Sequence, residues 1–500
     1  MKIHGMPDFE IHDEIVRRIG RLADALGLEV YLVGGAVRDG LMRRRSKDID
    51  ITVVGDGIRF GRRVHEELRT SVPVEFDRFG TSRLMADGIE IEFVGTRKET
   101  YEEDSRKPTV AEGSIDDDLL RRDFTVNAMA VRLNARGFGE LLDPFDGQGD
   151  IERRLLRTPV DPLVTFTEDP LRMIRAFRFA SQLDFRIDPD VLAAVRQLNE
   201  RILIVSMERI RDEFLKILAS PKPSIGLAPM MENGLIAHFF PELHALAGVD
   251  QRSIEYPDGV KNFHHKDVFY HTLRVVDNLA KVSDSLWLRM SALLHDIAKP
   301  QTKYFHPETG WTFHGHAEIG ARRVKRIFRV MKLPFEAVHF VEKMVALHLR
   351  PIALVNEGVT DSAIRRLLFD AGEDIDDLIM LCRADITSKN PRLVERYLRN
   401  YENLVLKMKD VEDKDKLRTW QPPLRGEEIM QICGIPSGIM VGIIKTRIED
   451  AILDGLIPNE RHAAEEFLLS IKDEVLKQPA IKKDQPLRGR LKSLPEGLQP

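Results

Sequence analysis

The chain has 500 residues, of which 43% are hydrophobic and 31% charged, and its formal net charge is −5 at pH 7. This length predicts two to four domains, and the net charge argues against a uniformly basic nucleic-acid-binding surface but leaves room for a local basic stripe. Two cysteines exclude a disulfide framework, no apolar run approaches the roughly 18 residues of a membrane span, and the start lacks a signal-peptide core. We expect a cytoplasmic protein without a membrane partner, and nothing indicates an obligate protein partner.

Short apolar runs with strand character recur in the first 150 residues, and helical patterns such as 58–69 separate them. The runs are EVYLVGG (29–35), DIDITVV (48–54), IEIEFVG (89–95) and MAVRLN (129–134). The acidic segment 99–118 has no periodicity, which predicts a mobile loop. After residue 165 the pattern becomes a succession of amphipathic helices, so we expect an α+β fold with a mostly α-helical second part.

The stretch 31–54 (YLVGGAVRDGLMRRRSKDIDITVV) combines features suited to phosphate chemistry. Gly34 and Gly35 lie between a strand and a helix, where glycine lets the backbone approach a ligand and free helix N–H groups suit phosphate. Asp48 and Asp50 are two residues apart on the next strand, so their side chains share a face. Such a pair can hold Mg²⁺ ions, which can activate an attacking hydroxyl and steady a leaving pyrophosphate. This is the chemistry of nucleotidyl transfer.

A third carboxylate is expected on the strand at 89–94, where Glu90 and Glu92 share a face. Spacing does not separate them, so Glu92 is our choice and Glu90 the alternative. An Asp-x-Asp pair alone occurs by chance in many proteins. Its combination with a strand, two glycines, Arg38 and Asp39 is much harder to obtain by chance.

A charged cluster follows at Arg121, Arg122 and Asp123. Two cations can hold triphosphate oxygens, and an acid can accept a hydrogen bond from a ribose hydroxyl. The alternative is an ordinary surface ion-pair cluster.

The stretch EDPLR offers a means of selecting a base. We expect Thr167 to cap a helix whose first turn contains Pro170. Asp169 and Arg172 are three residues apart and can form a surface salt bridge of little consequence. Alternatively, the carboxylate accepts from an exocyclic amine while the guanidinium donates to ring acceptors. Because cytosine and adenine both carry such an amine, the pair can select C and A against U and G.

The second half contains a spaced set of histidines and aspartates. The stretch LLHDIAK places His295 and Asp296 near the end of an apolar helix. The remaining members are His271, His316, His348 and Asp385. A lone histidine is usually a surface or core residue, but such a set on successive helices suits a transition metal such as Ni, Co or Mn.

Five ordered stretches resemble the class II tRNA nucleotidyltransferases and bacterial poly(A) polymerases. They are GGAVRDGLMRRRSKDIDI (34–51), RRDFTVNAMA (121–130), LLDPFDGQGDI (141–151), EDPLRMIRAFRFASQLDF (168–185) and ERIRDEFLKIL (208–218). The resemblance implies a polymerase-β-like nucleotidyltransferase head, a helical neck for base selection and RNA binding, an HD-type body and a helical tail with a basic C-terminus. The corresponding ranges are 1–155, 156–245, 246–405 and 406–500.

The resemblance also implies roles for individual residues. Base choice would fall to Asp169 and Arg172, with Glu168 in support. The catalytic carboxylates that hold Mg²⁺ would be Asp48, Asp50 and Glu92. The rest of the nucleotide site would comprise Gly34, Gly35, Arg38, Arg122, Asp123 and Asn127.

The order His…His-Asp…His…His…Asp over residues 264–390 resembles the HD phosphohydrolase superfamily. The resemblance implies a helical metal site able to hydrolyse phosphate esters or cyclic phosphates. Its expected ligands are His271, His295, Asp296 and Asp385, with His316 and His348 as further candidates. The alternative is an HD fold that serves only as a body holding tRNA.

The expected function is template-independent addition of CCA, from CTP and ATP, to the 3′ end of tRNA. The alternatives are an enzyme adding only A or only CC, a poly(A) polymerase, an HD hydrolase as the main activity, and a catalytically inactive RNA-binding scaffold. The stretch 78–85 is similar to the tRNA branch rather than to poly(A) polymerases, and 99–118 resembles the loop needed for terminal A addition. Asp48, Asp50 and Arg122 argue against the scaffold.

Overall fold

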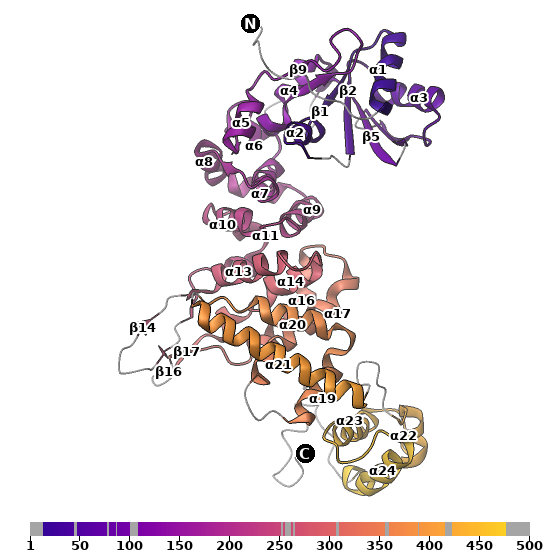
Figure 1. The fold of residues 1–500 in the computed structure, drawn as a ribbon, viewed down its shortest axis with the longest axis vertical. Coiled ribbons are helices and arrows are strands. Elements are labelled where there is room, and N and C mark those ends of the chain that lie inside the picture. Colours follow the sequence, from indigo (N-terminus) through magenta and orange to yellow (C-terminus); the bar gives the residue numbers. More distant parts are fainter. Residues whose placement is uncertain are drawn as a thin grey trace.

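Figure 1 shows an elongated molecule, with a mixed sheet and its helices at one end and helices making up most of the rest. The computed structural model describes residues 14–44, 48–77, 80–86, 88–100, 109–251, 254–255, 262–263, 266–306, 310–355, 360–388, 390–415 and 423–476. Among these residues, no helix combines the length and the apolar character needed to cross a membrane.

Seven strands form the main sheet in the order β3-β4-β5-β2-β1-β8-β9. They are β1 (Val30–Val33), β2 (Asp48–Val53), β3 (Val74–Phe76), β4 (Thr81–Ala86), β5 (Ile89–Gly95), β8 (Ala130–Arg132) and β9 (Leu141–Leu142). β2 and β5 pair in parallel, and the other neighbours in this sheet are antiparallel. The sheet and the helices after it confirm the expected α+β class with a mostly helical second part.

Three helices accompany this sheet; the sequence predicts the second and third, and the first was not predicted. They are α1 (Glu14–Leu26), α2 (Gly35–Leu41) and α3 (Gly57–Leu68). α3 begins after Asp56, whose carboxylate accepts a hydrogen bond from the Arg59 backbone N–H. The buried ring of Phe60 then meets Phe93 of β5 edge to face, with centroids 5.4 Å apart, and so fixes the helix against the sheet.

The acidic segment expected to be a loop contains regular structure. Its elements are β6 (Arg97–Thr100), which pairs with β7 (Thr109–Glu112), and α4 (Ile115–Leu120). Ser114 caps α4: its hydroxyl accepts from the Asp117 N–H, and the Asp117 carboxylate accepts from the Ser114 N–H. The loop prediction for 99–118 is therefore wrong in these parts; in α4 the acids of the first turn favour the helix. Residues 101–108 lie outside the described residues.

The remaining elements up to residue 244 are helices and two small strands, of which η2 precedes β8 and the others follow β9. They are η2 (Thr125–Asn127), α5 (Gly147–Arg153), β10 (Leu155–Leu156), α6 (Pro162–Glu168), α7 (Leu171–Leu183), β11 (Arg186–Ile187), α8 (Pro189–Leu198), η3 (Asn199–Ile204), α9 (Met207–Leu218), α10 (Ser224–Glu232), α11 (Ile236–Phe239) and α12 (Pro241–His244). The predicted cap by Thr167 is wrong, because Thr167 lies inside α6. The Asp169 carboxylate instead accepts from the Leu171 N–H, at 3.1 Å, where α7 begins.

The largest helical part comes next. Its helices are α13 (Val268–Ala280), α14 (Leu286–Leu294), α15 (Lys299–Thr302), α16 (His316–Val330), η4 (Phe335–Ala337), α17 (Val338–Leu347), α18 (Arg350–Ala353), α19 (Asp361–Ala371), η5 (Gly372–Asp374), α20 (Ile375–Ala384) and α21 (Pro391–Asp415). Small strand pairs join β12 (Asp250–Gln251) to β15 (Lys266–Asp267), β13 (Ile254–Glu255) to β14 (Asn262–Phe263), and β16 (Tyr304–His306) to β17 (Gly310–Thr312). The last helices are α22 (Gly426–Cys433), α23 (Ile439–Leu453) and α24 (Arg461–Leu476).

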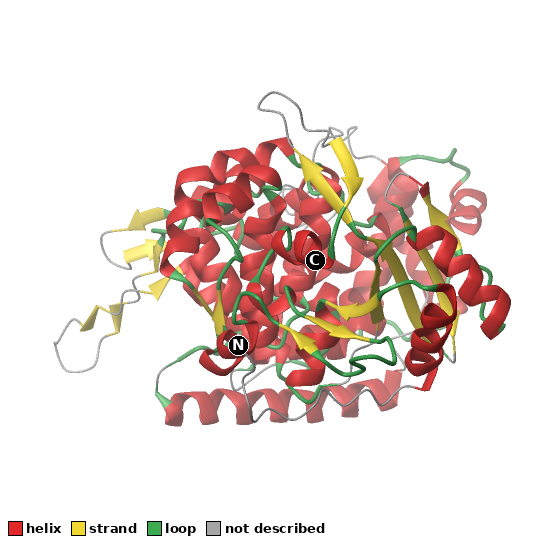
Figure 2. Ribbon diagram, turned by 90° about the horizontal axis from the view of Figure 1, so that it is seen from above, coloured by secondary structure: helices red, strands yellow, loops and turns green. Residues whose placement is uncertain are grey.

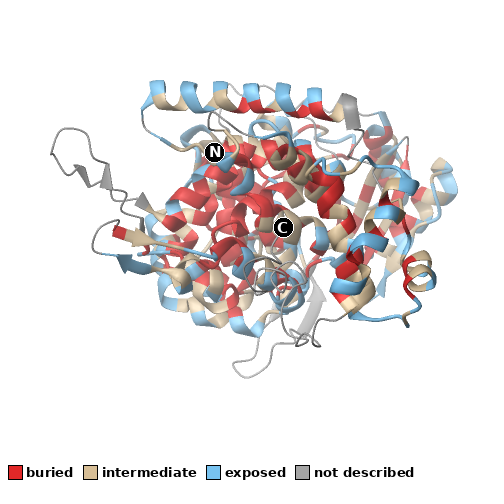
Figure 3. Ribbon diagram, turned by 90° about the horizontal axis from the view of Figure 1, so that it is seen from below, coloured by how far each residue is buried: buried red, intermediate tan, exposed pale blue. Residues whose placement is uncertain are grey.

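The two end views show how these helices pack. Helices make up most of the molecule in Figure 2, and Figure 3 shows buried residues concentrated inside the helical mass. One apolar cluster of buried residues extends from Phe124 to Leu453 in the sequence, and a separate one fills the C-terminal helices. α21 crosses the expected boundary at 405/406, so the division into four domains stays a prediction. The expected basic C-terminus, after residue 476, lies outside the described residues.

Candidate functional site

The predicted carboxylates meet on two neighbouring strands. The parallel register sets Asp48 opposite Glu90 and Asp50 opposite Glu92. Burial, followed by the negative charge of Glu92, raises the pKa of Asp50 above its usual value. Arg83 reaches both glutamates, with Nη2 at 2.9 Å from Glu92 Oε2 and Nε at 3.4 Å from Glu90 Oε1. A half-buried acid crowded by other acids suits a bound divalent cation, and the register favours Glu92 as its third neighbour.

Gly34 brings the backbone close to this acidic group. Its φ is 67°, a left-handed value that favours glycine. A Cβ at Gly34 would lie 2.9 Å from Arg122 Nη1 and 3.5 Å from Asp50 Oδ2. At Gly35 the nearest atom would be Arg38 Nη2 at 3.6 Å, an ordinary contact. The close approach therefore depends on Gly34 rather than on both glycines.

A buried acid that the sequence reading missed holds the two adjacent arginines. Asp118 forms ion pairs with Arg121 and, at 2.9 Å, with Arg122 Nη2, and its side chain is 0% exposed. Burial alone would raise the pKa of Asp118, but the charges of Arg122 and Arg121 lower it below its usual value. Asp118 thereby fixes Arg122 beside Asp50. No sequence signal separated it from the neighbouring acids of a presumed loop.

The residues expected at the nucleotide and sugar site form one hydrogen-bonded chain. Arg38 Nη1 donates to Asn127 Oδ1 at 2.7 Å, and Asn127 Nδ2 donates to Asp123 Oδ1 at 3.0 Å. Arg175 Nε, from α7, donates to Asp123 Oδ2 at 2.7 Å. Although burial opposes it, these contacts lower the pKa of Asp123 to about 2. Arg175 was missed because its partner lies fifty-two residues away in the sequence.

The EDPLR side chains take other partners than spacing suggested. Arg172 Nη1 donates to Glu168 Oε2 at 3.1 Å, and its Nη2 donates to the Arg121 carbonyl at 2.6 Å. Asp169 Oδ2 accepts from Arg209 Nη2 of α9 at 2.9 Å. The prediction of a simple salt bridge between Asp169 and Arg172 is therefore wrong, because each side chain has another partner. Glu168 and Arg209 instead hold the two side chains separately.

The predicted metal ligands converge in the largest helical part. His271 Nε2 lies 2.9 Å from Asp385 Oδ1, and His295 Nε2 lies 3.1 Å from Asp296 Oδ2. His271, His295 and Asp296 each offer a ligand atom within 4.8 Å of the others, and all three are buried. The expected four residues are thus brought together.

A second group of the same kind shares Asp296. His316 Nε2 lies 3.3 Å from Asp296 Oδ1 and 3.3 Å from His348 Nε2. These three residues also present ligand atoms within 4.8 Å of one another. Burial and the charge of His295 lower the pKa of His348 to about 4, so its imidazole is neutral at pH 7, as a metal ligand must be.

Each of the four imidazoles is oriented through its other ring nitrogen. The Nδ1 partners are Thr387 Oγ1 for His271 and the carbonyls of Ala292, Phe313 and Val345 for His295, His316 and His348. Carbonyls accept, so the Nδ1 of those three rings carries a proton, and Nε2 is the nitrogen that faces Asp296. The buried His295 Nε2 has no properly oriented hydrogen-bond partner among the described residues. This donor set fits a transition metal.

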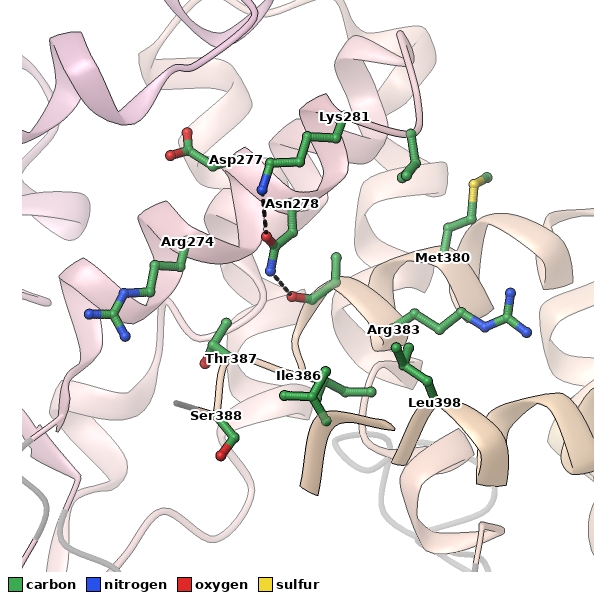
Figure 4. Close-up of a pocket in the computed structure, with 13 residues that line it drawn as sticks. Arg274, Asp277, Asn278, Lys281, Met380, Arg383, Ile386, Thr387, Ser388 and Leu398 are labelled. Atoms are coloured by element: carbon green, nitrogen blue, oxygen red, sulfur yellow. Dashed lines mark hydrogen bonds between the residues drawn. The ribbon is translucent and has the colours of Figure 1, made fainter. Parts of the chain in front are cut away.

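A cavity of about 810 Å³ lies between α13, α20 and the start of α21. Its wall includes Thr387, whose hydroxyl holds His271 Nδ1. In Figure 4 Arg274 and Arg383 point away from each other, and Asn278 bridges Lys281 and a backbone carbonyl. Thr387 thus orients a predicted metal ligand, and the labelled arginines do not converge on one point of the cavity.

Comparison with family models divides the chain into three matched regions. Residues 30–157 match the poly A polymerase head domain, 184–246 match the probable RNA and SrmB-binding site of polymerase A, and 268–390 match the HD domain. The first region contains the carboxylates of β2 and β5, and the third contains both histidine groups.

Curated relatives extend over most of the chain. The A-adding tRNA nucleotidyltransferase of Deinococcus radiodurans is 32% identical, over 84% of this chain and 90% of its own length. The CC-adding tRNA nucleotidyltransferase of Thermus thermophilus is 30% identical, over 88% and 93%. The multifunctional CCA protein of Pseudomonas fluorescens is 35% identical, over 62% and 72%. The Bacillus stearothermophilus CCA-adding enzyme, solved with CTP, shares the fold at a TM-score of 0.62 and 24% identity, covering 95% of this chain and 100% of that chain.

Proposed function

The chain belongs to the family of tRNA nucleotidyltransferases and poly(A) polymerases, and we propose that it adds CCA, from CTP and ATP, to the 3′ end of tRNA. The observation that carries the proposal is the register of β2 and β5, which gathers Asp48, Asp50 and Glu92 beside Arg122. The named relatives include A-adding, CC-adding and multifunctional enzymes, so the extent of addition is the finer part of the proposal. Incubation with tRNA ending at the discriminator base, in CC or in CCA, each with one labelled nucleotide, tests it.

The reaction joins the RNA 3′ hydroxyl to the α-phosphate of the nucleotide and releases pyrophosphate. Asp48, Asp50 and Glu92 would hold Mg²⁺, which supplies the positive charge that favours attack and departure. Arg122, fixed by Asp118, and Arg38, fixed by Asn127, provide cationic donors for triphosphate oxygens.

Base selection would rest on the turn between α6 and α7. There the Asp169 carboxylate can accept from the amine of cytosine or adenine, and the Arg172 guanidinium can donate to ring acceptors. Uracil and guanine present a carbonyl oxygen at the corresponding position. That oxygen and the Asp169 carboxylate are both acceptors, so no hydrogen bond forms between them. Glu168 and Arg209 keep the two side chains in place before the nucleotide binds.

We expect Asp169→Ala to relax nucleotide discrimination, because it removes the acceptor for the exocyclic amine. The loss of such a base contact costs about 1–3 kcal/mol of discrimination, or roughly 5- to 150-fold. Single-turnover addition with each of the four nucleotides measures it. Asp212→Ala is the matched control, since Asp212 pairs with Arg211 on the surface of α9. Unchanged preference in Asp169→Ala would assign Asp169 a purely structural role.

A second candidate function is hydrolysis of phosphate esters at the histidine cluster. The observation that favours it is the convergence of four oriented, buried imidazoles on Asp296. His271, His295, Asp296 and Asp385 would hold a transition metal, which can supply an activated water for attack on phosphorus. A 2′,3′-cyclic phosphate is a suitable substrate for such chemistry.

His295→Ala should lose bound metal and lower hydrolysis of 2′,3′-cyclic AMP at least tenfold in the presence of Ni²⁺, Co²⁺ or Mn²⁺. His339→Ala is the control, because His339 is 94% exposed and lies outside the cluster. Nucleotide addition should persist in both variants, since Asp48 and Asp50 belong to the sheet. Metal analysis of the purified protein accompanies the rates. Absence of both metal and metal-stimulated hydrolysis in the parent protein would leave this part as a tRNA-holding body.

A further inference from the structure

The outer face of α16 carries a row of positive charges. Its exposed cations are Arg322, Lys325, Arg326 and Arg329, here called the α16 basic face. At 3.6 residues per turn these positions fall within an arc of about 100° on the helix surface. The buried side chains of α16 lie on the opposite side, against the core. The four charges therefore face solvent together.

These cations lack the partners that arginines elsewhere have. In the part of the chain that the structure describes, none of the four forms an ion pair, although Glu318 lies one turn from Arg322. By contrast, Arg175 pairs with Asp123 and Arg209 pairs with Asp169. Like charges three and four residues apart destabilise a helix slightly. A cluster of four exposed cations in a chain with more acids than bases is a surface suited to a polyanion.

The position of α16 links the two candidate sites. Its first residue, His316, belongs to the histidine cluster. Just beyond its last residue, the Lys332 carbonyl accepts a hydrogen bond at 2.7 Å from Arg211 of α9. The same α9 contributes Arg209, the partner of Asp169. A 15-residue helix is about 22 Å long, so α16 spans the distance between the histidine cluster and the base-selecting neck.

We propose that the α16 basic face binds the phosphate backbone of tRNA while its 3′ end is extended. This inference rests on the proposed function, which identifies tRNA as the ligand. It adds the surface of the protein that binds the tRNA. Exposed cations in a row, which form no ion pair with the residues that the structure describes, suit phosphates, because phosphates repeat along a strand and are bound without sequence specificity. A protein partner would instead call for a central apolar patch, whereas the exposed apolar side chains of α16, Ile319 and Val330, lie near its two ends and the cations lie between them.

The test reverses two charges on this face and leaves the rest of the chain intact. In Arg322→Glu/Arg329→Glu we expect the Kd for tRNA, from fluorescence anisotropy, to rise at least tenfold. The slope of log K against log salt should fall by about two, one for each lost phosphate contact. In nucleotide addition, the KM for tRNA should rise while kcat and the KM for ATP stay unchanged. Arg322→Lys/Arg329→Lys should bind as the parent does, because backbone binding depends on charge.

Lys407→Glu/Lys409→Glu is the matched control, with two charges reversed at exposed positions of α21. We expect its Kd for tRNA to stay within twofold of the parent. If Arg322→Glu/Arg329→Glu matched this control in Kd and salt slope, or if the lysine variant lost binding equally, the inference would be overturned. Failure of the parent protein to extend tRNA would overturn the proposed function instead, so the two failures are distinguishable.

Discussion

Asp50→Asn will reduce nucleotide addition to tRNA by about 10³-fold, a loss of the size seen when charge stabilisation is removed from a reaction centre. The substitution preserves volume but removes the carboxylate that lies opposite Glu92. Without that charge, the acidic group has weaker affinity for Mg²⁺, and the developing charge on the phosphate is not balanced. Single-turnover incorporation of labelled ATP into tRNA ending in CC measures the effect.

The Asp50→Asn variant should still bind tRNA although it adds nucleotides slowly. We expect the Kd for tRNA to change less than threefold, because a metal-holding carboxylate contributes to reaction rather than to docking. Asp56→Asn is the control: it makes the same change near the same sheet, and asparagine can still cap α3. Near-normal addition by Asp50→Asn would remove the carboxylate from the catalytic centre.

Asp118→Ala will destabilise the protein by about 3–5 kcal/mol, the cost of removing one partner from a buried ion pair. The Asp118 side chain is fully buried, and it is the carboxylate shared by Arg121 and Arg122. Because Arg122 then loses its position beside Asp50, we also expect slower nucleotide addition. Urea unfolding gives the stability change. Asp116→Ala, in the same turn of α4 but exposed, should change stability by under 1 kcal/mol.

The stability difference should depend on pH in a defined direction. The folded state lowers the pKa of Asp118, so its contribution is fully present above the unfolded pKa of about 4. It is lost as pH falls through the lower folded pKa. The gap between parent and Asp118→Ala should therefore narrow on acidification below about pH 4. A gap that widened there would contradict the assigned ion pairs.

Local patterns predicted that the carboxylates of β2 and β5 lie on adjacent strand faces, because the pattern is short-range. A period of two puts Asp48 and Asp50 on one strand face, and a glycine pair marks the turn before α2. The sequence could not choose between Glu90 and Glu92, since both share a face. Only the register between β2 and β5 distinguishes them, and register is a long-range property.

The residues that hold the site side chains in place were not predicted, again because their contacts are long-range. Asp118 stands in an acidic run without periodicity, and only folding buries it against Arg122. Arg209 reaches Asp169 from another helix, and Thr387 reaches His271 across more than a hundred residues. Such contacts are formed by packing of distant segments and leave no spacing signal. The set of histidines and aspartates was easier to predict from the sequence, because metal-ligand residue types are distinctive wherever they occur.

One measurement tests the proposed addition of CCA most directly. Purified protein is incubated with tRNA ending at the discriminator base, in CC or in CCA, each with one labelled nucleotide. We predict that CTP alone extends the first by two residues and ATP alone extends the second by one. The third should stay unchanged, and UTP or GTP should extend none. Extension of only one substrate would contradict full CCA addition, long A tails would indicate a poly(A) polymerase, and no extension at all would contradict the transferase assignment.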